Sequence, residues 1–277
     1  MLRGLVDPER PLTLAGLDVG FSPRKRTAGL ARLAGGKCSF SCCFGREAEA
    51  ELARYGIYDL IAIDGPILPA GCKNLTMVRP VERLFSSGLF QKRCKPGMSH
   101  VRGTGISLRE AAGFAASFAN RLTSDSRVTA FFPKVRDGAV VEAFPNAFLG
   151  VCLEDEVFRN MPILSRGQKF DWLYYHWREK RRVKKLSGLN LREKFYLEET
   201  FNRAAHHEHR AALVCVITAL LISRNRFTAV GEEGGGWFFL PPWECWAEWA
   251  QEAVENTAFT LNREGTCIQI VRSGVQK

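Results

Sequence analysis

The sequence predicts an α/β fold in which helices flank a mixed sheet. An apolar strand over 14–17 ends on Asp18, and two further strand-like runs follow at 27–33 and 37–44. After a short helix over 46–55, a run that is apolar on both faces covers 60–63 and ends on Asp64, as expected of a buried strand. Strand, hairpin, helix and strand in this order are typical of the first half of an α/β layer fold.

The remaining elements follow from local patterns. Gly35-Gly36 supplies the positive φ angles of a two-residue hairpin. Ser107 and Glu110 form a capping box that would open a helix over 107–122. We expect one domain over 1–277, with a basic loop insertion at about 67–106 and a helical insertion at about 151–200. The other predicted elements are a short helix at 80–85, a strand at 139–145, helices at 154–160, 169–186, 191–205 and 208–222, strands at 227–230 and 237–240, a helix at 243–256 and an edge hairpin within 259–271.

Composition and charge narrow the class of protein. The chain has 277 residues, 46% of them apolar, which is normal for a globular core. Its 39 basic and 29 acidic residues give a net charge of +10, which favours a polyanionic partner such as nucleic acid. The nine cysteines include no Cys-x-x-Cys pair, so we expect reduced thiols and a cytoplasmic location. The longest apolar run, 211–222, is shorter than the ~20 residues that span a bilayer, so no membrane partner is expected.

Four acids occupy positions suited to metal binding. Asp18, Asp64 and Glu142 lie at or near strand ends, and Glu208 opens a helix. Carboxylate oxygens are the ligands that Mg²⁺ and Mn²⁺ prefer, and two such ions ~4 Å apart can clamp a phosphodiester. The arrangement requires that the strands carrying the acids are neighbours. The simpler alternatives are turn chemistry for the two aspartates and a favourable helix-dipole interaction for Glu208.

Six short pieces occur in an order that resembles a known family. They are Gly16-Leu17-Asp18-Val19-Gly20, Ala62-Ile63-Asp64-Gly65-Pro66, Arg79-Pro80-Val81-Glu82-Arg83, Val141-Glu142-Ala143-Phe144-Pro145, His207-Glu208 before Ala211-Ala212-Leu213-Val214-Cys215, and Gly231-Glu232 before Gly236-Trp237-Phe238-Phe239-Leu240-Pro241-Pro242. Together they resemble the predicted-nuclease family catalogued as domain-of-unknown-function family 429, which has a ribonuclease H-like fold. In that fold the first strand, a later strand and a C-terminal helix bring carboxylates together on a metal. The resemblance implies a metal-dependent nuclease-like site built on Asp18, Asp64, Glu142 and an acid of the last helix.

The chain departs from the family pattern at one position. Family members carry an Asp just before the Ala-Leu of the last helix, where this chain has Ala211. Glu208 lies one turn earlier on the same helical face and is the residue that can stand in. His207 or His209 could instead supply a nitrogen ligand. The site could therefore hold one metal ion rather than two, or be slow or inactive.

Basic residues near these acids and in the insertions are candidates for binding a nucleic acid. The aromatic residues at 172, 174, 175 and 177 precede the basic block 178–185, a combination that suits base stacking but also fits a solvated helix face with half of the rings in the core. The cluster His206, His207 and His209 could bind zinc or simply form a polar helix start. The candidate nucleic-acid-binding residues are Arg24, Lys25, Arg26, Arg79, Lys92, Arg93, Arg102, Arg181 and Arg182.

Three functional hypotheses follow. The first is a metal-dependent nuclease, a hydrolase using Mg²⁺ or Mn²⁺. The second is a catalytically impaired protein of the same fold that binds nucleic acid or another partner. The third is an ATP-dependent phosphotransferase of the actin-like or sugar-kinase type, which shares the opening acid-plus-hairpin layout but normally needs a duplicated second half. The sequence leaves open DNA or RNA as substrate, and the oligomeric state.

Overall fold

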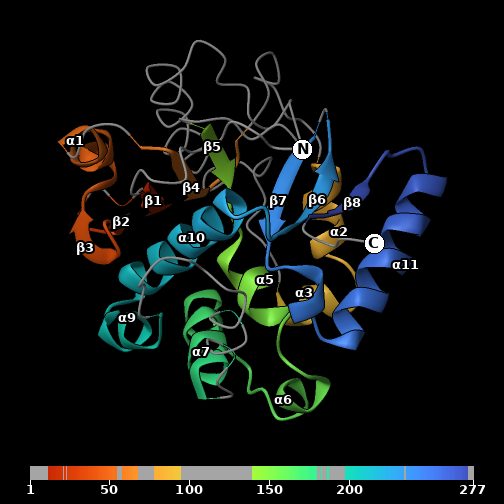
Figure 1. The fold of residues 1–277 in the computed structure, drawn as a ribbon. Coiled ribbons are helices and arrows are strands. Elements are labelled where there is room, and N and C mark those ends of the chain that lie inside the picture. Colours follow the sequence, from red (N-terminus) through yellow and green to blue (C-terminus); the bar gives the residue numbers. More distant parts are fainter. Residues whose placement is uncertain are drawn as a thin grey trace.

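The computed structural model contains a five-stranded mixed sheet, which occupies the upper left of Figure 1. The structure describes residues 12–20, 22, 24–54, 58–67, 78–94, 139–179, 182, 186, 197–233 and 235–273. The strands are β1 (Thr13–Asp18), β2 (Ala28–Ala34), β3 (Lys37–Cys43), β4 (Leu60–Asp64) and β5 (Ala139–Glu142). Their order in the sheet is β3-β2-β1-β4-β5, which confirms the predicted α/β class with a mixed sheet.

The sheet combines a meander with two parallel additions. Strands β1, β2 and β3 pair antiparallel, while β4 pairs parallel to β1 and β5 parallel to β4. At the turn between β2 and β3, Gly35 and Gly36 have φ angles of 55° and 73°, as predicted for this hairpin. Because β1 and β4 are parallel neighbours, their final residues, Asp18 and Asp64, come to the same edge of the sheet.

Helix α10 (His207–Ser223) crosses one face of the sheet in direct backbone contact with β1 (Figure 1). A Cβ on Gly16 would lie 2.2 Å from both the carbonyl oxygen of Ala212 and the backbone nitrogen of Val216. Only glycine permits so close an approach of helix and strand. The helix is buried from Ala211 to Ile222, so its apolar run belongs to the core. In the part of the chain that the structure describes, no helix has the length and hydropathy needed to cross a membrane.

The opposite face of the sheet carries a smaller apolar cluster. The turn η1 (Gly45–Glu47) leads into α1 (Ala48–Arg54). Leu52 of α1 belongs to the same buried cluster as Leu17 of β1 and Ile63 of β4. By strand alternation, residues next to Leu17 and Ile63 in sequence, including Asp18 and Asp64, point to the α10 face instead.

A second, three-stranded sheet follows α10 and continues from the edge of the first. It consists of β6 (Thr228–Glu232), β7 (Gly236–Leu240) and β8 (Gln269–Arg272), in the antiparallel order β7-β6-β8. A parallel bridge between Ala143 and Phe239 joins β7 to the end of β5. Helix α11 (Glu248–Arg263) packs against α2 (Pro80–Phe85) and α3 (Gly88–Arg93) beside this sheet. The other described helices are α5 (Pro145–Gly150), α6 (Asp155–Arg159), α7 (Arg166–Glu179), α9 (Leu197–Arg203) and the short η3 (Trp243–Cys245).

Three predicted elements differ over the described residues. The helix expected over 243–256 is two elements, the 3₁₀ helix η3 and α11, which begins at Glu248. The edge hairpin expected within 259–271 is wrong, because α11 continues to Arg263 and this segment contributes one described strand, β8, which pairs with β6 at the edge of the second sheet. The buried stripe of Val254, Ala258 and Leu261 has helical spacing and anchors this part of α11. The strand expected over 139–145 ends at Glu142, and Pro145 opens α5, consistent with the preference of proline for the first helical turn. The helix expected over 107–122 lies outside the described residues.

Candidate active site

Asp18 and Asp64 form the centre of the candidate site. They are register partners on the adjacent parallel strands β1 and β4. Neighbouring strands lie about 4.8 Å apart, and residues in register point to the same face. Both side chains are half-buried at the edge of the sheet. The requirement that the strands carrying these two acids are neighbours is therefore met.

The first turn of α10 brings Glu208 to the same edge. Gly29 on β2 is the register partner of Asp18. A Cβ on Gly29 would lie 2.1 Å from the carbonyl oxygen of Glu208, so the helix backbone rests directly on this glycine. Glu208 is therefore held over β2, one strand away from Asp18.

The charges of these three acids act on two buried or half-buried thiols. The pKa of Cys215, on α10, is raised well above its usual value by burial and then by Asp64 and Asp18. The pKa of Cys42, on β3, is raised by burial and then by Glu208 and Asp18. Asp18 thus acts on both thiols. The three carboxylates form one negative region between the sheet edge and the start of α10.

Ala211 completes the helix face above this region. It lies between Glu208 and Cys215 at helical spacing, so it faces the same region, and its side chain is buried. The position that bears an acid in the resembling family therefore contributes only a methyl group here. Over the described ranges, no group of three or more His, Cys, Asp or Glu side chains is arranged to hold a metal ion.

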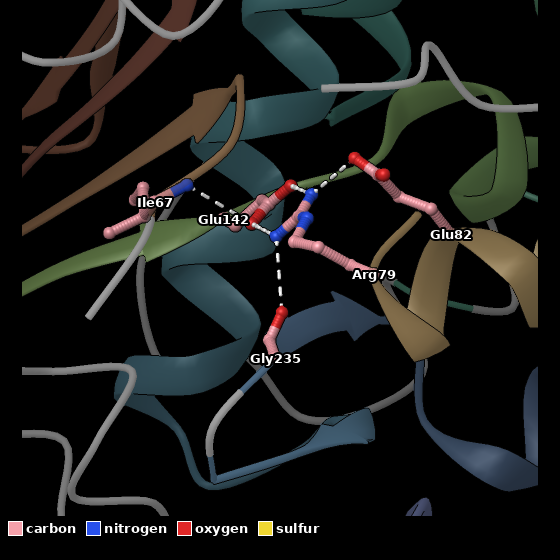
Figure 2. A network of polar contacts seen from close by, with 5 residues as sticks. All are labelled: Ile67, Arg79, Glu82, Glu142 and Gly235. Carbon is pink, nitrogen blue, oxygen red and sulfur yellow. Dashed lines mark hydrogen bonds and ion pairs between the residues drawn. The ribbon is translucent and has the colours of Figure 1, made fainter. Parts of the chain in front are cut away.

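Glu142 does not join the other three acids. Its register partner is Ile63, one residue before Asp64, so strand alternation directs it to the face opposite Asp64. Figure 2 shows its carboxylate in a two-point ion pair with Arg79, at 2.7 Å and 2.8 Å. It also accepts the backbone N–H of Ile67 at 3.2 Å. The expected fourth metal ligand is therefore occupied by a guanidinium and a backbone amide.

Arg79 is the centre of this buried network (Figure 2). Its guanidinium also donates to Glu82 at 2.8 Å and to the carbonyl oxygen of Gly235 at 3.5 Å. Burial raises the pKa of Glu142 to about 7, although Arg79 and the Ile67 N–H act to lower it. Burial acts to lower the pKa of Arg79, but Glu142 and Glu82 outweigh burial and raise it. Arg79 is therefore a buried permanent cation.

The expected basic residues between β1 and β2 lie on the surface. Arg24, Lys25 and Arg26 are exposed, and the Ser22 hydroxyl oxygen accepts the backbone N–H groups of Arg24 and Lys25 at 3.3 Å and 3.2 Å. These residues follow β1, the strand that carries Asp18. Among the expected nucleic-acid-binding residues, they are therefore the nearest in sequence to one of the acids.

Two expected nucleic-acid-binding residues are corrected by their burial. Arg79 is only 2% exposed and is used by Glu142 and Glu82. Arg93 is 8% exposed, pairs with Asp155, and lies over the rings of Phe158 and Trp249. Both guanidinium groups are internal, so neither can contact a nucleic acid in this structure.

The remaining basic candidates differ in their surroundings. Lys92 is exposed. Arg182 pairs with Glu154 at 2.6 Å, which reduces its value as a phosphate ligand. Arg102 and Arg181 lie outside the described residues. Among the nearby aromatic residues, Tyr174 and Trp177 are in the core and Tyr175 is 39% exposed, as the core alternative predicted for half of the set.

The histidines at the start of α10 make contacts of three kinds. His207 Nδ1 lies 3.3 Å from an oxygen of Asp171 on α7, and Arg210 donates to the other oxygen at 2.8 Å. His209 stacks on Phe40 of β3 with ring centroids 5.3 Å apart, and His206 meets His209 edge to face. These contacts fix α10 against α7 and β3, which fits a polar helix start better than a zinc site.

Sequence reasoning missed the partners that hold the site in place. Gly29 is one, and a glycine inside a strand pattern is a signal of close backbone approach. The pairing of Arg79 with Glu142 is another. The two residues are far apart in the chain, and no local sequence pattern indicates that they pair. Comparison with protein-family models, with curated proteins and with solved structures found no match for this chain.

Proposed function

We propose that this protein is a divalent-metal-dependent nuclease, a hydrolase of phosphodiester bonds in nucleic acid. The observation that carries the proposal is the register pairing of Asp18 with Asp64 at one sheet edge, with Glu208 held above Gly29.

The arrangement of elements supports a ribonuclease H-like fold. The resemblance implies that the first strand, a later strand and a C-terminal helix bring their acids together. Here β1, β4 and α10 carry Asp18, Asp64 and Glu208, respectively. The meander followed by parallel strands is compatible with that fold.

The donor atoms are of the kind that Mg²⁺ and Mn²⁺ prefer, although the described side chains as they lie form no ready-made group of three metal ligands. All three side chains offer carboxylate oxygens, which hard divalent cations prefer over nitrogen or sulfur. Asp18 and Asp64 would be the principal ligands, and Glu208 the third. The ion would activate water and stabilise the leaving oxygen of the phosphodiester.

The chain itself would bind and orient the nucleic acid. Arg24, Lys25 and Arg26 are exposed beside β1 and would pair with phosphates near the acids. The Ser22 hydroxyl accepts the backbone N–H groups of Arg24 and Lys25, which holds the backbone at these two residues.

The test is cleavage of labelled single- and double-stranded DNA and RNA by Asp18→Asn and Asp64→Asn in Mn²⁺. Each variant keeps the shape of the side chain and removes the charge, so cleavage should fall to background while the melting temperature stays near that of the wild type. Glu252→Gln, an exposed position on α11, is the matched control and should cleave normally. Unchanged cleavage by Asp18→Asn, or cleavage that persists in EDTA, would refute the proposal.

A second candidate function is nucleic-acid binding without turnover. Ala211 favours it, because the helix offers a methyl group where the resembling family has an acid. This candidate predicts salt-sensitive binding with no product in Mg²⁺ or Mn²⁺. Product that appears with wild type and disappears with EDTA would exclude it.

A further inference from the structure

Glu142 contacts the chain on both sides of the segment that follows β4. Its Oε2 accepts the N–H of Ile67, three residues after Asp64, and both of its oxygens bind Arg79, just before α2. The backbone of β5 adds a further tie next to Asp64, because the N–H of Ala143 donates to the carbonyl of Ile63 at 2.8 Å. The residues at the end of β4 and directly after it, here called the β4 exit, are thus held by one side chain of β5 and by one backbone hydrogen bond from the residue after β5.

The side chains of the network drawn in Figure 2 are buried. Glu142 is 3% exposed and Arg79 is 2% exposed. Arg79 also lies over the ring of Phe238 on β7, 5.5 Å from its centroid. The carbonyl of Ile67 approaches Gly236, where a Cβ would lie 3.4 Å from that oxygen. Arg79 and Ile67 are therefore held between the two sheets.

We infer that Glu142 is a positioning residue that fixes the β4 exit, and with it Asp64, and that it is not a metal ligand. The inference rests on the proposed function, because the position of Asp64 has a chemical consequence only if Asp64 holds the metal. Two contacts and one orientation carry it: the two-point pair with Arg79, the bond from Ile67, and the direction of Glu142 away from the face of Asp18 and Asp64. Arg79 contributes indirectly, because its guanidinium holds the Glu142 carboxylate in place.

The experiment compares Glu142→Gln with Glu142→Leu. The amide oxygen of Gln can still accept the Ile67 N–H, whereas Leu has a similar size and accepts nothing. Hydrogen exchange at the Ile67 amide should be about tenfold faster in Glu142→Leu, the loss expected for one hydrogen bond, and close to wild type in Glu142→Gln. Leu261→Ala on α11 is the control for general loss of stability and should not accelerate exchange at Ile67 selectively.

Metal affinity supplies the second readout. Mn²⁺ binding, followed by electron paramagnetic resonance, should weaken by about tenfold or more in Glu142→Leu, as is typical when a residue that orients a metal ligand is lost. Arg79→Met should also weaken it. Glu142→Gln should retain most of the affinity, and Asp64→Asn should abolish it.

Two results would overturn the inference. One is Glu142→Gln losing Mn²⁺ as completely as Asp64→Asn while the Ile67 amide stays protected, because Glu142 would then be a ligand. The other is unchanged exchange at Ile67 in Glu142→Leu. If the wild type binds no Mn²⁺ that depends on Asp18, the proposed function fails instead, and exchange at Ile67 still decides whether Glu142 fixes the β4 exit.

Discussion

The absence of one methyl group determines where Glu208 lies. Gly29 allows the carbonyl of Glu208 to rest on β2, where a Cβ would be 2.1 Å from that oxygen. The clash would involve the Cβ atom itself and a backbone carbonyl, so no change of rotamer can relieve it. Any larger residue must therefore displace the first turn of α10. Glu208 would move with that turn.

Gly29→Ala should therefore destabilise the protein by about 1–3 kcal/mol, the usual cost of overpacking. Urea unfolding followed by circular dichroism measures the loss. Gly167→Ala is the matched control, because a Cβ there would make only an ordinary 3.8 Å contact with the His207 ring. Helix propensity makes that control neutral or slightly stabilising. Equal midpoints for Gly29→Ala and wild type would contradict the close contact.

Two histidines of α10 should affect stability with opposite pH dependence. The hydrogen bond to Asp171 raises the pKa of His207. Its protonated form is favoured by folding, so its contribution is complete below the unfolded pKa of about 6.5 and is lost as the pH rises through the folded value. Burial and His206 lower the pKa of His209, so protonating His209 at low pH opposes folding.

The measurement is the melting temperature of His207→Gln and His209→Gln from pH 5.5 to 8.5. The deficit of His207→Gln relative to wild type should be greatest at acidic pH and shrink as the pH rises. His209→Gln should instead gain on the wild type at acidic pH. Parallel curves for the two variants would show that the two environments do not differ as described.

At the scale of elements, α10 carries both the core and the candidate site. Glu208, Ala211 and Cys215 share its face toward the sheet edge. After burial, the charges of Asp64 and Asp18 both raise the pKa of Cys215. A carboxylate at position 211 would therefore join the three acids already present.

Ala211→Asp should be destabilising without metal and recover with it. A buried charge added to the three acids should cost about 3 kcal/mol or more in EDTA. If the new carboxylate completes a metal site, Mn²⁺ at about 100 times its Kd should return about 2.7 kcal/mol. Ala211→Asn, which has the same size without the charge, should respond much less to Mn²⁺. Melting temperatures with EDTA and with Mn²⁺ decide the outcome, and a penalty in Ala211→Asp that Mn²⁺ leaves unchanged would argue against a metal at this edge.

The elements that the sequence predicted best have strong local signals. The two glycines predicted the hairpin between β2 and β3. The run before Asp64, which is apolar on both faces, indicated a buried strand between other strands. The end of α11 was missed because Phe259 is exposed, so the 259–271 region alternated loosely while Val254, Ala258 and Leu261 formed the buried stripe. Local pattern therefore failed where a helix face and a strand alternation give similar short signals.

At the scale of the whole molecule, long-range pairing separates the predicted site from the observed one. Asp18 and Asp64 were recognised because each ends its own strand. Arg79 followed by Pro80 reads as a surface loop in sequence, and nothing local indicates that its guanidinium is buried against Glu142. The net charge of +10 overstates the positive charge that a nucleic acid can reach, because the side chains of Arg79 and Arg93 are buried.

The exposed cations beside β1 should then account for much of the electrostatic binding to nucleic acid. Changing Arg24, Lys25 and Arg26 together to Gln should weaken binding to DNA and reduce the slope of log affinity against log salt concentration by about two to three, the value for three lost phosphate contacts on a duplex. A control with Arg159, Arg263 and Arg272 changed to Gln loses the same net charge from α6, α11 and β8. Fluorescence anisotropy in EDTA over 50–300 mM salt measures both slopes without cleavage. If both triple variants lose the same slope, binding follows net charge alone and the loop after Asp18 has no special role; a change confined to the first variant places the nucleic acid beside the three carboxylates.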